Sequence, residues 1–188
     1  MNGNRTRRWY QFSLRTLLLV VATSCLIPGT YVAHKEWKAR RQKSAIVAME
    51  RLGGVFVAAS EPTSGLDLGG TEIQDSDLAP LAEGPHLERL SLVCTRVTDN
   101  GMPHIQQLTE LRALYLDYNE VSDAGISQLA GLRNLQTLSL KDTQVTDAGL
   151  EHLAGLTRLN QLVLSGSNAS PAGIARLQKA LPKTVIWQ

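Results

Sequence analysis

The sequence predicts an α/β solenoid with a short parallel β-sheet on its concave side, helices on its convex side, and a transmembrane helix in front. A 24-residue pattern of apolar positions recurs over residues 63–182. Each unit changes from strand-like to helix-like spacing, and residues 16–33 carry no charge. We expect a basic tail (1–15), a membrane span (16–33), a juxtamembrane helix and linker (34–54), and a repeat domain with terminal caps (55–188).

The repeat is defined by its apolar positions. In units that begin at Leu87, Leu111 and Leu135, the residues at offsets 0, 3, 5, 10, 15, 18 and 21 are all apolar. Further units around Leu66 and Leu159 keep most of this pattern. Such units stack because none buries its apolar face alone, and the pattern weakens at the ends because terminal units meet water.

Each unit contains one strand and one helix. Its first part, LxxLxL, alternates like a strand with leucines pointing inward, and the later spacing of three is helical. Between the two stands a helix start: Thr98-Asp99, Ser122-Asp123, Thr146-Asp147 and Ser170-Pro171. The hydroxyl caps the free amides of the first turn, and the Asp complements the helix dipole.

A polar residue stands at offset 8 of every unit. These residues are Thr71, Thr95, Asn119, Thr143 and Ser167. We expect them to form a structural ladder that bonds the backbone where it turns from strand to helix.

Both ends of the solenoid need caps. Residues 38–52 predict a helix with Ile46, Met49 and Leu52 on one side, followed by a leading strand at 55–59. A final strand at 184–187 closes the other end, where we expect Trp187 to form an apolar lid.

The uncharged segment at 16–33 has the length of a membrane span. A helix of this length measures about 27 Å, close to the ~30 Å hydrocarbon core of a bilayer. We expect an uncleaved single-pass span, with a cleaved signal peptide or lipidation at Cys25 as open alternatives. Four Lys or Arg residues precede the span and five follow it, so orientation stays undetermined. The basic collar at 35–43 either stops translocation or binds anionic lipid.

The net charge of +2 is unevenly distributed. Residues 1–43 contain nine Lys and Arg and one acidic residue, whereas residues 44–188 contain ten and sixteen. Because phosphate contacts need clustered positive charge, this distribution argues against nucleic-acid binding.

No catalytic or metal-binding pattern is evident. His104 and His152 share offset 17 but stand two repeats apart, roughly 10 Å, too far to share a metal. Asp147 and His152 are five residues apart, on poorly matched helix faces. We therefore expect no catalytic residues, metal, cofactor or small-molecule substrate, and no enzymatic activity.

The concave face is the candidate binding surface. Strand residues at offsets 2, 4 and 6 point away from the core, and aromatic and Arg side chains without a core role often anchor interfaces. The candidates are Arg89, Tyr115, Asp117, Tyr118, Lys141 and Gln161. The alternative is that Asp117 and Lys141 form only a cross-strand ion pair.

The pattern LxxLxLxxTxVTDAGLxxLxxL resembles the leucine-rich repeat, in the subclass of ribonuclease-inhibitor-like and F-box-associated repeats. The layout, with RRWYQFSLRTLLLVV before LGGVFV and the repeats, resembles membrane-anchored repeat proteins of planctomycete-type bacteria. The resemblance implies a bacterial cell-envelope setting and a non-catalytic module that binds protein partners. The alternative is a structural or self-associating envelope component without a dedicated ligand.

Overall fold

The computed structural model describes residues 40, 43–58, 64–83 and 86–188. The predicted membrane span at 16–33 and the basic tail lie outside these residues. Among the residues described, no helix is both long and apolar enough to cross a membrane. The repeats lie within one compact unit, Arg41–Gln188.

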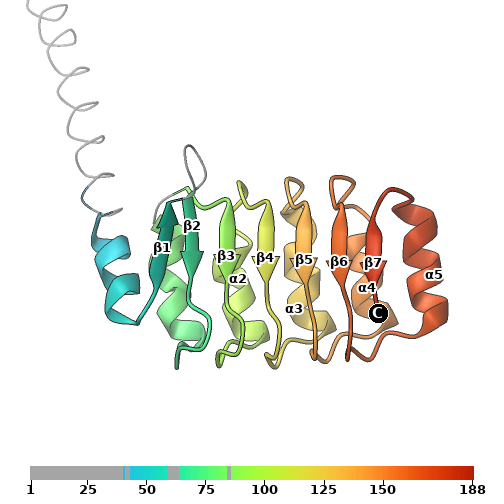
Figure 1. Ribbon diagram of the computed structural model, residues 1–188, viewed down its shortest axis with the longest axis horizontal. Coiled ribbons are helices and arrows are strands. Elements are labelled where there is room, and N and C mark those ends of the chain that lie inside the picture. The colour runs from blue at the N-terminus through green and yellow to red at the C-terminus, as the bar shows by residue number, and fades with distance from the viewer. Residues whose placement is uncertain (1–39, 41–42, 59–63, 84–85) are drawn as a thin grey trace, which may run out of the picture. The chain divides into compact units, whose positions relative to one another are not determined.

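Seven strands form one sheet in chain order (Figure 1). They are β1 (Val55–Ala58), β2 (Ser64–Asp67), β3 (Arg89–Ser91), β4 (Ala113–Tyr115), β5 (Thr137–Ser139), β6 (Gln161–Val163) and β7 (Val185–Trp187). β2 to β7 pair in parallel, and β1 pairs antiparallel with β2. Leu90 pairs with Leu114 and Leu114 with Leu138, so neighbouring strands are one 24-residue repeat apart.

Helices cover one face of the sheet (Figure 1). They are η1 (Asp75–Glu83), η2 (Asp99–Gly101), α2 (Met102–Ile105), α3 (Asp123–Gln128), η3 (Leu129–Gly131), α4 (Asp147–Leu153) and α5 (Pro171–Ala180). The first is a 3-10 helix that contains Pro80, which lacks the amide an α-helix would use there. We call the uncovered face of the sheet the concave face.

The leucines of successive repeats form one continuous core. Leu90, Leu114 and Leu138 are fully buried. Leu116 and Leu140, two residues after Leu114 and Leu138, are also fully buried. Burying one such side chain contributes about 1.5–3 kcal/mol. The predicted α/β repeat architecture, with a mostly parallel sheet, is confirmed.

A helical segment at residues 43–51 covers the N-terminal end of the core. Ala45 and Met49 are buried, but Leu52 is 37% exposed. The prediction that Leu52 shares the apolar side of this helix is wrong, because the helix ends just before it. Gly53 has a φ of 88°, and the Gly54 amide donates to the Met49 carbonyl at 2.9 Å to close the turn.

The C-terminal end is closed by Ile186 rather than Trp187. Ile186 pairs with Leu162 and is half-buried against the core. Because strand side chains alternate, Trp187 points to the concave face beside Val163 and is 57% exposed. The predicted Trp187 lid is therefore wrong. The Thr184 hydroxyl ties the final turn to the previous repeat by donating to the Leu159 carbonyl at 2.6 Å.

A row of carboxylates joins the repeats on the helical side. Each accepts two hydrogen bonds, from the amide and the hydroxyl of the capping residue 23 positions later. The pairs are Asp75 with Thr98, Asp99 with Ser122, Asp123 with Thr146, and Asp147 with Ser170. For Asp123 the distances are 2.8 Å to the Thr146 amide nitrogen and 2.6 Å to its hydroxyl oxygen. We call the four carboxylate residues, Asp75, Asp99, Asp123 and Asp147, the aspartate ladder.

The aspartate ladder also explains a recurring glycine. A Cβ at Gly125, Gly149 or Gly173 would overlap the ladder carboxylate of the previous repeat. The motif [ST]-D-A-G therefore contains three coupled parts: a cap, a carboxylate for the next repeat, and a glycine that leaves room for the previous one. The expected interaction of Asp with the helix dipole describes only the local part of this role.

Replacing Asp123 by Ala removes both bonds to Thr146 at once. Because hydrogen bonds to charged acceptors are stronger than neutral ones, we expect a loss of about 2–4 kcal/mol in the free energy of unfolding. Urea denaturation of the full chain, followed by circular dichroism, measures this. In Glu120→Ala, which changes an exposed carboxylate, the loss should stay below about 0.5 kcal/mol. Equal losses in the two variants would contradict the ladder's role.

Asp147 makes stability depend on pH. The Ser170 hydroxyl, the Ser170 amide and then Arg176 hold the pKa of the Asp147 carboxyl below its ordinary value. A group whose pKa is lower in the folded state stabilises the fold above its unfolded pKa, and this contribution is lost as pH falls through the folded pKa. We expect the urea midpoint to fall below about pH 4. In Asp147→Asn this decrease should be smaller, and an unchanged decrease would contradict the assignment.

Candidate interaction surface

The polar residues at offset 8 bond the turns that leave the strands. The hydroxyls of Thr71, Thr95 and Thr143 each donate to the carbonyl three residues earlier, at 2.7 to 3.0 Å. Ser167 differs, since its oxygen only accepts a long bond of 3.5 Å from an amide two residues later.

Asn119 has the most contacts of this group. Its side-chain amide donates to the Leu92 carbonyl at 2.6 Å and to the Leu116 carbonyl at 3.1 Å, while its oxygen accepts from the Thr95 amide at 3.2 Å. Asn119 is 5% exposed, so these bonds satisfy a buried polar group and fix the turn that carries Tyr118.

The residue just before each polar residue at offset 8 adopts a left-handed backbone. The φ values are 71° at Gly70, 54° at Cys94, 57° at Tyr118, 51° at Asp142 and 74° at Gly166. Glycine takes this conformation without steric cost, whereas a bulky side chain there is uncommon and strained. Tyr118 is thus the least expected residue of the five.

Tyr118 and Lys141 lie together at the end of β4 and β5. The Lys141 ammonium is 5.0 Å from the centre of the Tyr118 ring, and Tyr118 is 47% exposed. The Tyr118 side chain raises the pKa of Lys141, and the carboxylates of Asp142 and Asp117 raise it further. Lys141 therefore stays protonated, beside an exposed aromatic ring.

Asp117 fixes the neighbouring strand instead of pairing with the Lys141 side chain. Its Oδ1 accepts from the Ser139 hydroxyl and, at 2.9 Å, from the Lys141 backbone amide. No ion pair joins the Asp117 carboxylate to the Lys141 ammonium among the described residues. The alternative interpretation, a simple cross-strand ion pair, is therefore not supported.

The structure brings together some of the predicted site residues. Asp117, Tyr118 and Lys141 are neighbours, and Tyr115 lies two residues before Asp117 on the same face. Arg89 and Gln161 lie elsewhere, at the starts of β3 and β6, three strands and about 14 Å apart. The centre of a common surface is therefore the Tyr115–Tyr118 region with Lys141.

Sequence reasoning missed two contributors to this face. Cys94 shares the left-handed position of Tyr118, and Trp187 adds an exposed aromatic ring on β7. The signals were present: Gly70 and Gly166 mark the left-handed position, and the 24-residue period places Ile186 opposite Leu162.

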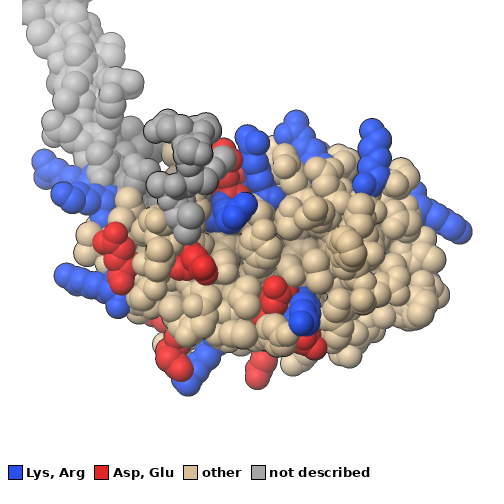
Figure 2. Space-filling view, viewed as in Figure 1, with Lys and Arg blue, Asp and Glu red and all other residues tan. Residues whose placement is uncertain are grey.

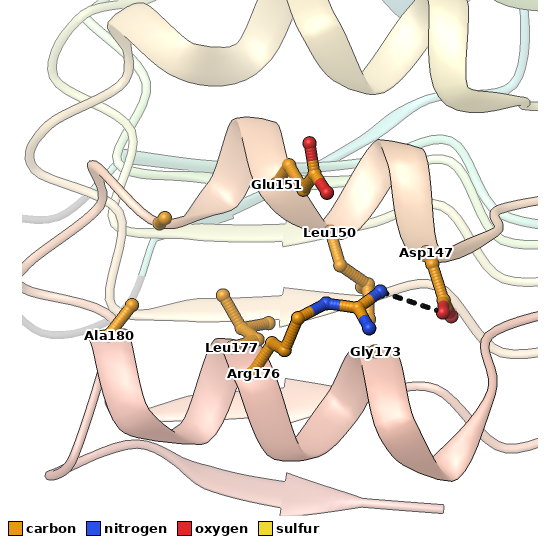
Figure 3. A pocket seen from close by; sticks show the side chains of 8 residues that line it. Asp147, Leu150, Glu151, Gly173, Arg176, Leu177 and Ala180 are labelled. Atoms are coloured by element: carbon orange, nitrogen blue, oxygen red, sulfur yellow. Dashed lines mark hydrogen bonds and ion pairs between the residues drawn. The ribbon is translucent and has the colours of Figure 1, made fainter.

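A cavity of about 210 Å³ lies between α4 and α5 on the helical side (Figure 3). Leu150, Leu177 and Ala180 line it, and Arg176 reaches across to Asp147 with a nitrogen–oxygen distance of 3.0 Å. Asp147 also accepts two bonds from Ser170, so its carboxylate has a structural role at this position. No set of His, Cys, Asp and Glu side chains suited to a metal occurs in the part of the chain that the structure describes.

The comparison with family models agrees with this architecture. Residues 109–169 match the family model described as leucine rich repeat. The chain is similar to a leucine-rich repeat protein of Leptospira interrogans, with 26% identity, a TM-score of 0.46, and coverage of 57% of this chain and 27% of that one. It is also similar to internalin C2 of Listeria monocytogenes, with 22% identity, a TM-score of 0.40, and coverage of 65% and 69%. The comparison with curated proteins gave no match.

The matched family model covers residues 109–169, and the same unit of one strand followed by one helix recurs on both sides of this segment. Residues 109–169 are therefore similar to leucine-rich repeats. The chain spans about a quarter of the length of the Leptospira protein and is only distantly similar to either bacterial structure.

The left-handed backbone at Tyr118 gives a testable difference between two tyrosines. Glycine relieves strain at Tyr118, so Tyr118→Gly should change the free energy of unfolding by less than about 1 kcal/mol. Tyr115 lies in the extended strand β4, where glycine weakens the strand and removes half-buried ring surface, at a cost of roughly 2 kcal/mol. Urea denaturation of the two variants checks this, and equal costs would contradict the assigned strain.

Proposed function

We propose that this chain is a membrane-anchored leucine-rich repeat module that binds a protein partner through its concave face, centred on Tyr118. The observation that carries the proposal is the strained, exposed tyrosine at a position where two other repeats have glycine. Folding does not require a bulky residue there, and backbone strain concentrates at functional sites.

The chemistry around Tyr118 suits protein recognition. Tyrosine offers a large and rigid contact surface, and tyrosines are enriched at the centres of interfaces. Lys141 adds a positive charge beside the ring, and Tyr115 adds a second aromatic side chain on the same face. A partner that presents an apolar group next to a carboxylate would contact the Tyr118 ring with the first and the Lys141 ammonium with the second.

The setting of the module is part of the proposal. Residues 16–33 serve as an uncleaved single-pass anchor in a bacterial cell envelope, of the kind found in planctomycete-type repeat proteins. The repeats are of the ribonuclease-inhibitor-like subclass. Support comes from the length and lack of charge of this segment and from the form of the repeat.

Photo-crosslinking on the concave face tests the binding role. A benzophenone amino acid at Tyr115 in the full chain should give a crosslinked hetero-complex in native membranes. Adding Tyr118→Ser or Lys141→Gln should reduce this product at least tenfold, because interface centres carry most of the binding energy. The control position is Gln128, which is exposed on the helical side. Equal crosslinking at Tyr115 and Gln128, or products insensitive to both substitutions, would overturn the assignment.

A second candidate function is self-association as an envelope component. The observation that favours it is the edge strand β7, where Val185 is 51% and Trp187 is 57% exposed. An exposed apolar edge strand readily pairs with another chain. Light scattering of the detergent-solubilised chain discriminates: a concentration-dependent dimer that Trp187→Glu dissociates would favour this function over the first.

A further inference from the structure

The repeats divide their charges between two rims. We define the strand-start rim as the loops that lead from the helices into β4 to β7, and the strand-end rim as the turns that leave the strands. Each strand-start loop carries an exposed basic residue: Arg112, Arg133, Arg158 and Lys183. The loop into β4 also carries Glu110, which is bonded to His86, whereas the loops into β5, β6 and β7 contain no acidic residue. Figure 2 shows several Lys and Arg side chains along the upper edge of the domain, where this rim lies, and others at the lower edge and the N-terminal end.

The strand-end rim has the opposite charge. Its turns and helix starts from β4 onward carry five carboxylates against the single cation Lys141: Asp117, Glu120, Asp123, Asp142 and Asp147. Asp123 and Asp147 belong to the aspartate ladder, so folding accounts for part of this negative charge.

Folding does not account for the basic residues of the strand-start rim in the same way. Arg133 and Lys183 form no ion pair with any described residue, and the Arg158 guanidinium donates to the Asn134 side chain at 2.7 Å. Arg112 alone has a carboxylate partner, Glu88, at 3.2 Å. Their positive charges are therefore mostly free to act on something outside the domain.

The chain enters the repeat domain at this same rim. β1 is antiparallel to β2, and Val55 at its start pairs with Asp67 at the end of β2, on the strand-end rim. The helical segment 43–51 leads down to that point from the opposite rim (Figure 1). Residue 43 therefore lies on the side of the strand-start rim.

We propose that the strand-start rim, through Arg112, Arg133, Arg158 and Lys183, rests against the anionic lipid surface of the membrane that anchors the chain. The inference depends on the proposed membrane span at 16–33. Ten residues connect position 33 to position 43 and reach at most about 35 Å. Because position 43 is on the side of the strand-start rim, this rim is the nearer one to the proposed span. Basic residues near an anionic bilayer are attracted within a Debye length of about 8 Å, each by about fivefold in affinity.

This arrangement has a consequence for the concave face. The acidic strand-end rim is repelled by the same surface, so the strands point away from the bilayer. Tyr118 and Lys141, at the ends of β4 and β5, are then presented to partners on the far side of the domain. An acidic protein could also bind these basic loops. The membrane is favoured because the chain that carries the proposed span enters the domain on the side of this rim.

Fluorescence quenching in proteoliposomes tests the orientation. The full chain, with Cys25 and Cys94 replaced by Ser, carries a fluorophore at Thr157→Cys on the strand-start rim or at Gln144→Cys on the strand-end rim. Vesicles contain phosphatidylcholine alone or with phosphatidylserine, plus a lipid with a quencher on its headgroup. We expect quenching only at Thr157→Cys, stronger with phosphatidylserine, and weakened by high salt.

Two matched triple variants separate position from net charge. Arg133→Gln, Arg158→Gln and Lys183→Gln together remove three positive charges and should weaken rim contact about a hundredfold, abolishing the phosphatidylserine effect. Ala124→Glu, Ala148→Glu and Ala172→Glu change the net charge equally on the other rim, at exposed positions in the first turns of α3, α4 and α5. These should leave quenching unchanged.

The outcomes distinguish the inference from its premise. Release of the protein from vesicles by alkaline carbonate would refute the anchor, and the inference with it. A protein that resists carbonate but shows no quenching at Thr157→Cys, or equal quenching at both positions, would overturn the inference and leave the anchor intact. Loss of quenching in both triple variants would show a net-charge effect and would also overturn it.

Discussion

The structure depends on one constraint: each repeat must present a carboxylate to the cap of the next repeat. The leucine core is non-directional and would permit small slips between neighbouring units, because apolar contacts tolerate sliding. The aspartate ladder does not, since each carboxylate needs an amide and a hydroxyl of one particular residue. The glycines that adjoin the ladder leave the carboxylate the space it requires.

This fixed stacking determines what the concave face can present. Strand side chains at equivalent positions of successive repeats lie side by side at the spacing of a sheet. A residue that differs from its equivalents without a structural reason is therefore a candidate for function. Tyr118 is such a residue, because Gly70 and Gly166 show which residue suits its backbone. The charged residues of the strand-start rim are further examples, because the packing of the leucine core does not require particular residues in the loops.

Local and periodic features could be predicted from the sequence, whereas features set by contact between repeats could not. The leucine positions, the strand and helix of each unit, and the capping hydroxyls follow from spacing alone. The second role of Asp123 depends on which atoms of the next repeat lie within reach, and propensity carries no such information. The size of Trp187 predicts an apolar lid over the end of the core, although the register gives that place to Ile186. Gly70 and Gly166 mark the position of Tyr118 in the sequence, and the φ angle from the structure shows that the tyrosine adopts the same left-handed backbone.

Hydrogen exchange of individual amides tests the central constraint most directly. The amides of Ser122, Thr146 and Ser170 lie in turns at helix starts, where free amides exchange quickly, but each donates to a carboxylate of the previous repeat. Measured by NMR on the full chain in detergent micelles, these three amides should exchange as slowly as the strand amide of Leu138. Exchange at the rate of exposed turns would contradict the account, because the repeats would then be held together by leucine packing and strand pairing without the carboxylate bonds.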